Sequence, residues 1–183
     1  MAKIAIFFAQ GYEMIEALTV VDVCRRCGLT IDMVSVTEEK CVTSSHGVPV
    51  GMDKSFSEVN FDEYDMIVLP GGMPGTLGLE ATEELMEQVD AFYQNGKYVS
   101  AICAAPSILG HRGILKGKKA CCYPSFESHL EGAEVSQETV EISDKVITSR
   151  GMGTAIDFSI AIAAAFVGDA KAKEVAEGFI YFK

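Results

Sequence analysis

Residues 98–106 have the sequence Tyr-Val-Ser-Ala-Ile-Cys-Ala-Ala-Pro, an apolar run that ends in a turn of small residues. The run from Tyr98 to Ile102 is typical of a buried strand. Pro106 fits the first turn of a following helix, where its missing N–H costs nothing. Cys103 therefore stands at the corner between a strand and a helix, a position that exposes a side chain at the end of the sheet.

The rest of the chain repeats this alternation of short apolar runs and amphipathic stretches. We expect further strands at residues 3–8, 30–36 and 66–69, hairpins at 41–50 and 140–148, and helices at 14–27, 155–167 and 169–179. Another helix is expected between an N-cap at Thr82 and a stop at 95–96, and Ile15 is expected on the buried side of helix 14–27. The pattern predicts an α/β fold: a single doubly wound, flavodoxin-like domain over residues 1–183, with a mostly parallel central sheet flanked by helices.

Composition narrows the classes of function. The formal net charge is −11, which disfavours nucleic-acid binding, because phosphate contacts need a basic surface. The apolar run near the N-terminus is too short for a signal peptide or a membrane span, so we expect a cytoplasmic protein without a membrane partner. In that reducing compartment the six cysteines are not expected to form disulfides.

Three segments at expected strand ends carry the candidate chemistry. The N–H groups at the start of the helix after Cys103 favour a thiolate there, which makes Cys103 the candidate nucleophile. The turn at 70–72 brings backbone close to a ligand, and the N–H groups of Gly72 and Ala104 are candidates for an oxyanion hole. An ordinary turn after a core strand is the alternative for 70–72.

Glu16 is the third candidate. It lies among apolar neighbours near the start of the first helix, where a carboxylate is costly to bury unless it is protonated or hydrogen-bonded. Beside a thiolate, such a carboxyl would keep its proton and donate it to the sulfur. The alternative is that Glu16 is simply an acidic residue favoured at a helix start.

Six segments of the chain together resemble the ThiJ/PfpI family, most of all its branch around the Parkinson-disease protein DJ-one and its bacterial relatives. They are residues 13–16, 21–23, 25–28, 68–72, 101–106 and 148–154, in the family's order. The resemblance implies one domain of class I glutamine-amidotransferase-like type over 1–183 and a homodimer. It also implies that Cys103 is an oxidisable nucleophile, that Glu16 is its protonated partner, and that Gly72 and Ala104 supply backbone N–H groups.

Three positions depart from the family pattern. Ala104 stands where the protease-like branch has a histidine, which disfavours a peptidase. Tyr123 stands where several relatives place a histidine near the cysteine, so Tyr123 is the expected polar neighbour. His46 replaces a basic residue of an anion pocket, to which Arg26 is also expected to contribute.

The other cysteines and the histidines suggest no further site. Cys24 and Cys27 have the spacing of a redox motif but lie in the last turn of their helix, where packing is the expected role. Cys121 and Cys122 are adjacent and should point to opposite faces of a strand. The three histidines are scattered, so we expect no metal site and no cofactor.

Together with the candidate nucleophile, the family resemblance implies a cysteine-dependent enzyme that acts on small reactive carbonyls or their protein adducts, of the glutathione-independent glyoxalase or deglycase type. Its partners would be a small-molecule aldehyde or a glycated protein. The alternative is a non-enzymatic redox sensor or chaperone of the oxidative-stress response, and an amide hydrolase or peptidase is a weaker one.

Overall fold

The computed structural model describes residues 2–182, and its centre is a six-stranded sheet in the order β2-β1-β5-β6-β10-β9. All neighbouring strands are parallel except β9, which pairs antiparallel with β10. The strands are β1 (Lys3–Phe8), β2 (Thr30–Ser35), β5 (Met66–Leu69), β6 (Tyr98–Ile102), β9 (Val140–Ser143) and β10 (Val146–Ser149). Four consecutive buried residues in β5 explain why this central strand is apolar throughout.

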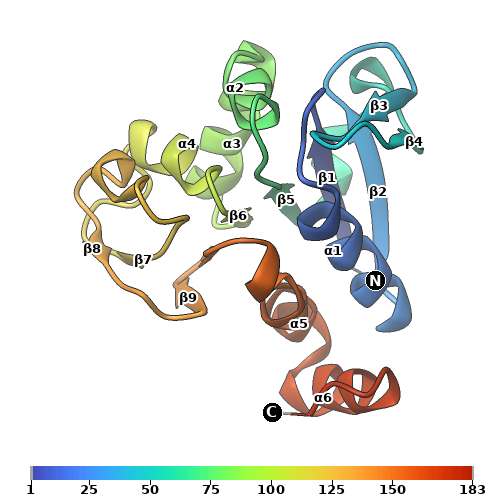
Figure 1. The fold of residues 1–183 in the computed structure, drawn as a ribbon, viewed down its shortest axis with the longest axis vertical. Helices are drawn as coiled ribbons and strands as arrows, with labels where there is room; N and C mark the ends of the chain where they lie inside the picture. The colour runs from blue at the N-terminus through green and yellow to red at the C-terminus, as the bar shows by residue number, and fades with distance from the viewer. Residues whose placement is uncertain (1, 183) are drawn as a thin grey trace.

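Helices cover both faces of the sheet (Figure 1). They are α1 (Met14–Arg26), α2 (Gly75–Glu80), α3 (Glu83–Gln94), α4 (Pro106–His111), α5 (Ala155–Val167) and α6 (Asp169–Gly178). One face packs against α1 and α5, with α6 behind them, and the other packs against α3 and α4. The expected α/β class, with a mostly parallel sheet flanked by helices, is confirmed. No helix within residues 2–182 has the length and apolar character needed to cross a bilayer.

Smaller elements complete the connections. The expected hairpin around residue 46 is formed by β3 (Cys41–Thr43) and β4 (Pro49–Gly51). A second small pair, β7 (Lys119–Ala120) and β8 (Glu134–Val135), is parallel and was not expected from the sequence. Short 3₁₀ turns lie at Phe56–Glu58, Phe61–Glu63, Glu127–His129 and Met152–Thr154.

One local expectation is wrong, and a second is right in position but not in its hydrogen bond. Ile15 is 43% exposed, because α1 turns Glu16, Ala17 and Val20 toward the sheet and leaves Ile15 on its outer side. Thr82 stands at the N-cap position of α3, but its hydroxyl donates to the carbonyl of Gly78 instead of accepting from the helix N-terminus. That bond ties α3 to the end of α2, a short helix that the sequence pattern did not reveal.

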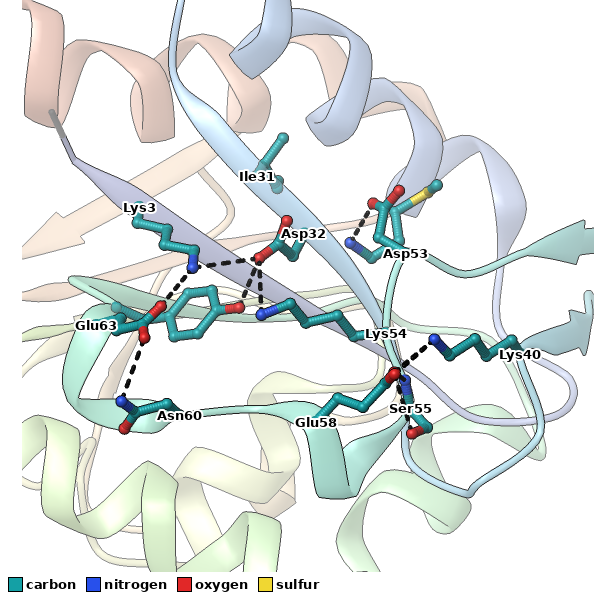
Figure 2. A network of polar contacts seen from close by, with 12 residues as sticks. Lys3, Ile31, Asp32, Lys40, Asp53, Lys54, Ser55, Glu58, Asn60 and Glu63 are labelled. Atoms are coloured by element: carbon teal, nitrogen blue, oxygen red, sulfur yellow. Dashed lines mark hydrogen bonds and ion pairs between the residues drawn. The ribbon is translucent and has the colours of Figure 1, made fainter.

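A polar network at the outer strands joins β1 and β2 to the segment that leads into β5 (Figure 2). The hydroxyl of the fully buried Tyr64 donates to Asp32 Oδ2 over 2.6 Å. The ammonium groups of Lys3 and Lys54 lie 3.6 and 3.7 Å from the same oxygen. Asp32 is thus surrounded by one hydroxyl and two cations, which stabilise its charge at the edge of the core.

Candidate active site

Cys103 follows the last residue of β6 with a φ of 65°, a left-handed conformation that is uncommon for a residue with a side chain. Two hydrogen bonds hold it there. Its N–H donates to the Ser149 carbonyl over 3.0 Å, and its carbonyl accepts from the Tyr123 N–H over 2.8 Å. This conformation costs about 1–2 kcal/mol, which the two bonds and the surrounding packing offset. The result is a nucleophile-elbow geometry, with the sulfur turned to the carboxyl end of the sheet.

Glu16 meets this sulfur from the first turn of α1. The Glu13 carboxylate caps the helix by accepting the Glu16 N–H over 2.7 Å. The Glu16 side chain is only 1% exposed, and its Oε2 accepts the Gly71 N–H over 3.0 Å. Its carboxyl is also hydrogen-bonded to the Cys103 side chain. A buried carboxyl and a thiol thus share one contact, although 87 residues separate them in the chain.

The loops after β1 and β5 make this meeting possible. The Glu13 N–H donates to the Gly71 carbonyl over 2.9 Å, and the Gly75 N–H donates to the Gly11 carbonyl over 3.2 Å. A Cβ on Gly71 would lie 2.5 Å from the Cys103 Cβ and 2.6 Å from Glu16 Oε2. Position 71 therefore admits only glycine.

Gly72 is restricted in the same way. It has a φ of 93°, and a Cβ there would lie 2.3 Å from the Glu13 nitrogen. Its backbone N–H and that of Ala104 both hydrogen-bond to the Cys103 sulfur. The two candidate oxyanion donors thus converge on the sulfur of the candidate nucleophile.

Burial changes the acidity of both Glu16 and Cys103. It raises the pKa of the Glu16 carboxyl from 4.5 to about 7, although hydrogen bonds from Cys103 and from the Gly71 N–H act in the opposite direction. Burial also raises the pKa of the Cys103 thiol to about 12, and the charge and hydrogen bonding of Glu16 add to this effect. The N–H groups of Gly72 and Ala104 lower that pKa in part. Burial therefore outweighs the stabilisation of a thiolate that the position at a helix start predicts.

The two groups act as one titrating pair. Because they are in contact and buried, they do not both ionise near neutral pH, and the first proton is lost near pH 7. The negative charge that this leaves can reside on either partner. Transfer of one proton from sulfur to carboxylate then creates the thiolate without changing the net charge of the site.

Tyr123 and Gly151 form the third side of the site. The Tyr123 side chain is 49% exposed, and its backbone is fixed to the Cys103 carbonyl. Gly151 follows β10, and a Cβ placed on it would lie 3.4 Å from Tyr123 Cδ2 and 3.9 Å from Glu16 Oε1. The Tyr123 ring and the Gly151 backbone thus flank the Glu16 carboxyl.

The structure does not bring Arg26 to this site. Arg26 is the last residue of α1, ten residues beyond Glu16, which is about 15 Å along the helix axis. Its guanidinium pairs with Asp22 over 2.7 Å and lies over the Phe179 ring. We therefore leave Arg26 out of the site.

His46 lies in the exposed turn of the β3–β4 hairpin, with its Nδ1 3.1 Å from the Ser45 hydroxyl. The Ser45 N–H donates to the carbonyl of Tyr12, so the turn lies against the loop that leads to Glu13. Within residues 2–182, the hydrogen bond of the His46 ring is to Ser45, and none joins it to Cys103 or Glu16.

The remaining cysteines lack the surroundings of Cys103. All six are free, and Cys41 is exposed. Burial raises the pKa of Cys24 and of Cys122 to about 12, as it does for Cys103. What distinguishes Cys103 is therefore its carboxyl partner and its two N–H donors rather than its acidity. In the part of the chain that the structure describes, no three His, Cys, Asp or Glu side chains gather as metal ligands would.

Sequence reasoning missed four residues that shape the site. Gly71 donates to Glu16, Glu13 caps the helix that carries Glu16, Ser149 holds the Cys103 backbone, and Gly151 faces the carboxyl. The double glycine after β5 and the Ser-Arg-Gly run at the end of β10 are visible in the sequence as turns at strand ends. The sequence does not show which of the two adjacent glycines touches the Glu16 carboxyl.

Comparison with known proteins agrees with this geometry. Residues 2–165 match the sequence model of the DJ-1/PfpI family. The chain belongs to this family. It is 33% identical to the oxidized DJ-1 of Toxoplasma gondii, whose structure superposes with a TM-score of 0.95 over the full length of both chains. The resemblance seen in the sequence, including its DJ-1 branch, is confirmed.

Some curated relatives are named as DJ-1 homologs and others as enzymes. The chain is 38% identical over 175 residues to the DJ-1 homolog B of Arabidopsis thaliana, but spans only 40% of that protein's length. It is 33% identical over 162 residues to the glutathione-independent glyoxalase DJR-1.2 of Caenorhabditis elegans, covering 87% of this chain and 85% of the relative. It is also 33% identical over 150 residues to the putative cysteine protease YraA of Bacillus subtilis, covering 81% and 88%. The last two names are those of enzymes.

Proposed function

We propose that the protein is a glutathione-independent glyoxalase or deglycase that uses Cys103 on small reactive carbonyls or on their protein adducts. The observation that carries the proposal is the contact between the Cys103 thiol and the buried Glu16 carboxyl, whose pKa is raised to about 7. A group with a pKa near the working pH can both accept and return a proton. The name of the Caenorhabditis elegans relative supports the same chemistry.

The geometry suggests a sequence of steps for an α-oxoaldehyde. The sulfur attacks the aldehyde carbon while Glu16 takes the thiol proton, giving a hemithioacetal. The Gly72 and Ala104 N–H groups stabilise the developing alkoxide. Glu16, having released its proton to that oxygen, removes the aldehyde carbon's proton and delivers it to the neighbouring carbonyl carbon. The hydroxyl proton of the hemithioacetal passes to the neighbouring carbonyl oxygen, so the former aldehyde carbon becomes the carbonyl of a thioester. Water then hydrolyses the resulting thioester, releasing a 2-hydroxy acid and the free thiol.

Production of lactate from methylglyoxal without glutathione tests this proposal. Wild type should turn over methylglyoxal, and Cys103→Ala should not, because the covalent step is lost. Cys41→Ala is the matched control, since it removes an exposed thiol away from Glu16. Equal turnover by wild type and Cys103→Ala, or none by wild type, would overturn the proposal.

One observation favours oxidation sensing as a second candidate function. Cys103 is only partly buried, and the N–H groups of Gly72 and Ala104 face its sulfur. The same donors would hydrogen-bond the oxygens of a sulfinate and hold that oxidised form. A wild type that oxidises at Cys103 under dilute peroxide yet turns over no aldehyde would favour this role.

The surroundings of Cys103 do not favour peptide hydrolysis. His111 lies 2.6 Å from Glu80 and 3.0 Å from His129, and His46 contacts Ser45. Within residues 2–182 no histidine therefore lies beside Cys103 as a general base. Release of amine from amide substrates by purified protein would support amide hydrolysis after all.

The proposal includes a cytoplasmic homodimer, as the family resemblance implies. Ile142 on the edge strand β9 is 59% exposed, and Ile160 and Ala161 on the neighbouring helix are only partly buried. This apolar surface is of the kind that a second copy would cover. Light scattering that shows only monomer at micromolar concentration would contradict the dimer.

A further inference from the structure

Two histidines that are 18 residues apart in the chain meet at the surface beside α4. His111 is the last residue of α4, and His129 is the last residue of a 3₁₀ turn. The Nε2 atom of His111 lies 3.0 Å from the Nδ1 atom of His129, and the ring centroids are 5.2 Å apart with the ring planes at 74°. Each ring thus points one nitrogen at the other, in a part of the molecule that the proposed reaction does not use.

The other ring nitrogen of His111 is held by a carboxylate. Its Nδ1 lies 2.6 Å from Oε1 of Glu80, the last residue of α2. An ionised carboxyl can only accept a hydrogen bond, so Nδ1 carries the proton and Nε2 of the neutral ring presents its lone pair to His129. A histidine that binds a metal ion is commonly oriented in this way, by a carboxylate on the ring nitrogen that does not bind the ion.

The packing of α4 keeps the two rings in this arrangement. A Cβ on Gly110 would overlap the carbonyl oxygen of His129, so α4 contacts the backbone of the turn directly. Leu130, which follows the turn, is 3% exposed and belongs to the core. The His129 ring also lies against the Phe126 ring, with the centroids 5.7 Å apart. Packed neighbours therefore place both histidines, although both are exposed to solvent.

The distance between the two facing nitrogens is that of neighbouring ligands on one metal ion. Two metal–nitrogen bonds of about 2.0–2.1 Å span 3.0 Å when they meet at roughly 95°. That angle suits the tetragonal ligand sets of Ni²⁺ and Cu²⁺ better than the tetrahedral set of Zn²⁺, and imidazole is a good ligand for both ions. Mg²⁺ and Ca²⁺ prefer oxygen ligands and are not expected there.

Binding of an ion leaves the number of protons on the pair unchanged. Without an ion, the Nδ1–H of His129 donates to Nε2 of His111. When an ion binds, that proton moves through solvent to Nε2 of His129, and Nδ1 becomes a ligand. The surroundings favour a cation, because Glu80 is a carboxylate, the chain carries a net charge of −11, and the neighbouring Arg112 is paired with Asp90.

We propose that His111 and His129 form a binding site for a divalent transition metal ion of the Ni²⁺ or Cu²⁺ kind, with Glu80 orienting His111 through its other ring nitrogen. The two imidazole nitrogens are the protein ligands, and water takes the remaining positions, so the ion is held reversibly. In the part of the chain that the structure describes, no three ligand side chains gather, which agrees with a two-histidine site rather than a structural metal centre. This pairing modifies the expectation, drawn from scattered positions in the sequence, that the histidines build no metal site.

Calorimetric titration with NiCl₂ of the protein without an added histidine tag tests the site. We expect one saturable Ni²⁺ site per chain in wild type, and none in His111→Ala or His129→Ala. His46→Ala is the matched control and should bind as wild type does, because it removes the third histidine, which is exposed on the β3–β4 hairpin. The comparison is made with Cys41 and Cys103 replaced by alanine throughout, so that no thiol with access to solvent competes for the ion.

A second pair of variants tests the role of Glu80. Glu80→Ala should weaken Ni²⁺ binding by about 10–100-fold, because the carboxylate no longer fixes the ring and proton of His111. Glu87→Ala removes the same charge from the exposed side of α3 and should leave the affinity near the wild-type value. Equal weakening by the two variants would overturn the orienting role of Glu80.

A third measurement needs no variant at the site. Paramagnetic Ni²⁺ should broaden the ring-proton NMR signals of His111 and His129 and leave those of His46 sharp. Equal broadening of all three histidines, Ni²⁺ uptake that survives in either histidine variant, or no saturable site in wild type would overturn the proposal. None of these measurements involves aldehyde turnover, so the metal site and the proposed function are tested separately.

Discussion

We expect the ionisation of the buried Glu16 carboxyl, which the proposed reaction needs, to destabilise the folded protein. Its pKa is raised from 4.5 in the unfolded chain to about 7 in the folded protein. The folded state therefore binds more protons than the unfolded state between these values, and stability falls as the pH rises through this window. A pKa difference of about 2.5, at roughly 1.4 kcal/mol for each pKa unit, corresponds to about 3 kcal/mol lost above pH 7. The side chain is 1% exposed, so solvent screening reduces this figure little.

Glu16→Gln removes the ionisation and keeps the shape. The amide oxygen can still accept the Gly71 N–H, and the amide N–H can still donate to the Cys103 sulfur. Urea unfolding at pH 5 and pH 8 measures the effect. Wild type should lose about 2.5 kcal/mol relative to Glu16→Gln between these pH values, so the variant becomes the more stable protein at pH 8. Glu87→Gln, on the exposed side of α3, is the control and should track wild type.

The same variant should be the less reactive protein. Without a carboxylate to take its proton, the Cys103 thiol must ionise into solvent from a buried position. The pH at which iodoacetamide alkylation reaches half its maximum rate should then rise from near 7 by at least one unit. Parallel stability curves for wild type and Glu16→Gln, with overlapping alkylation profiles, would refute the assignment of Glu16 as the buried proton carrier.

Three further predictions follow from other contacts. Gly71→Ala should lower the free energy of unfolding by about 1–3 kcal/mol in urea titrations, because the added Cβ overlaps both Cys103 and Glu16. It should also abolish the selective alkylation of Cys103, and wild-type behaviour in either measurement would contradict the prediction. Dilute peroxide should oxidise Cys103 to sulfenic and then sulfinic acid before any other cysteine, and peptide mass spectrometry showing another thiol modified first would defeat this order. Asp32→Ala should cost about 1.5–3 kcal/mol of stability, since it leaves the buried Tyr64 hydroxyl without its charged acceptor; an unchanged urea midpoint would count against it.

Local patterns in the sequence sufficed for most of the secondary structure. The apolar runs at 66–69 and 98–102 are strands, and the helix at 155–167 has the expected ends, because period and end residues are properties of neighbouring positions. Errors arose where a tertiary contact overrode a local preference. Ile15 faces outward because the neighbouring Glu16 is drawn into the core. The hydroxyl of Thr82 turns to the carbonyl of Gly78 instead of capping its own helix.

The sequence by itself determined the fold class and the place of the candidate nucleophile. A cysteine between a buried strand and a helix that begins with proline stands at the end of a sheet in any arrangement of the other strands. The tertiary structure decided what surrounds that cysteine. The order β2-β1-β5-β6-β10-β9 places the ends of β1, β5 and β6 side by side, so Glu16, Gly71 and Cys103 meet although they are distant in the chain. Arg26, only ten residues from Glu16, is carried to the opposite end of α1. The pKa of Glu16 is raised mainly by burial, and that burial is produced jointly by all the residues packed around it. It could therefore be known only from the folded chain.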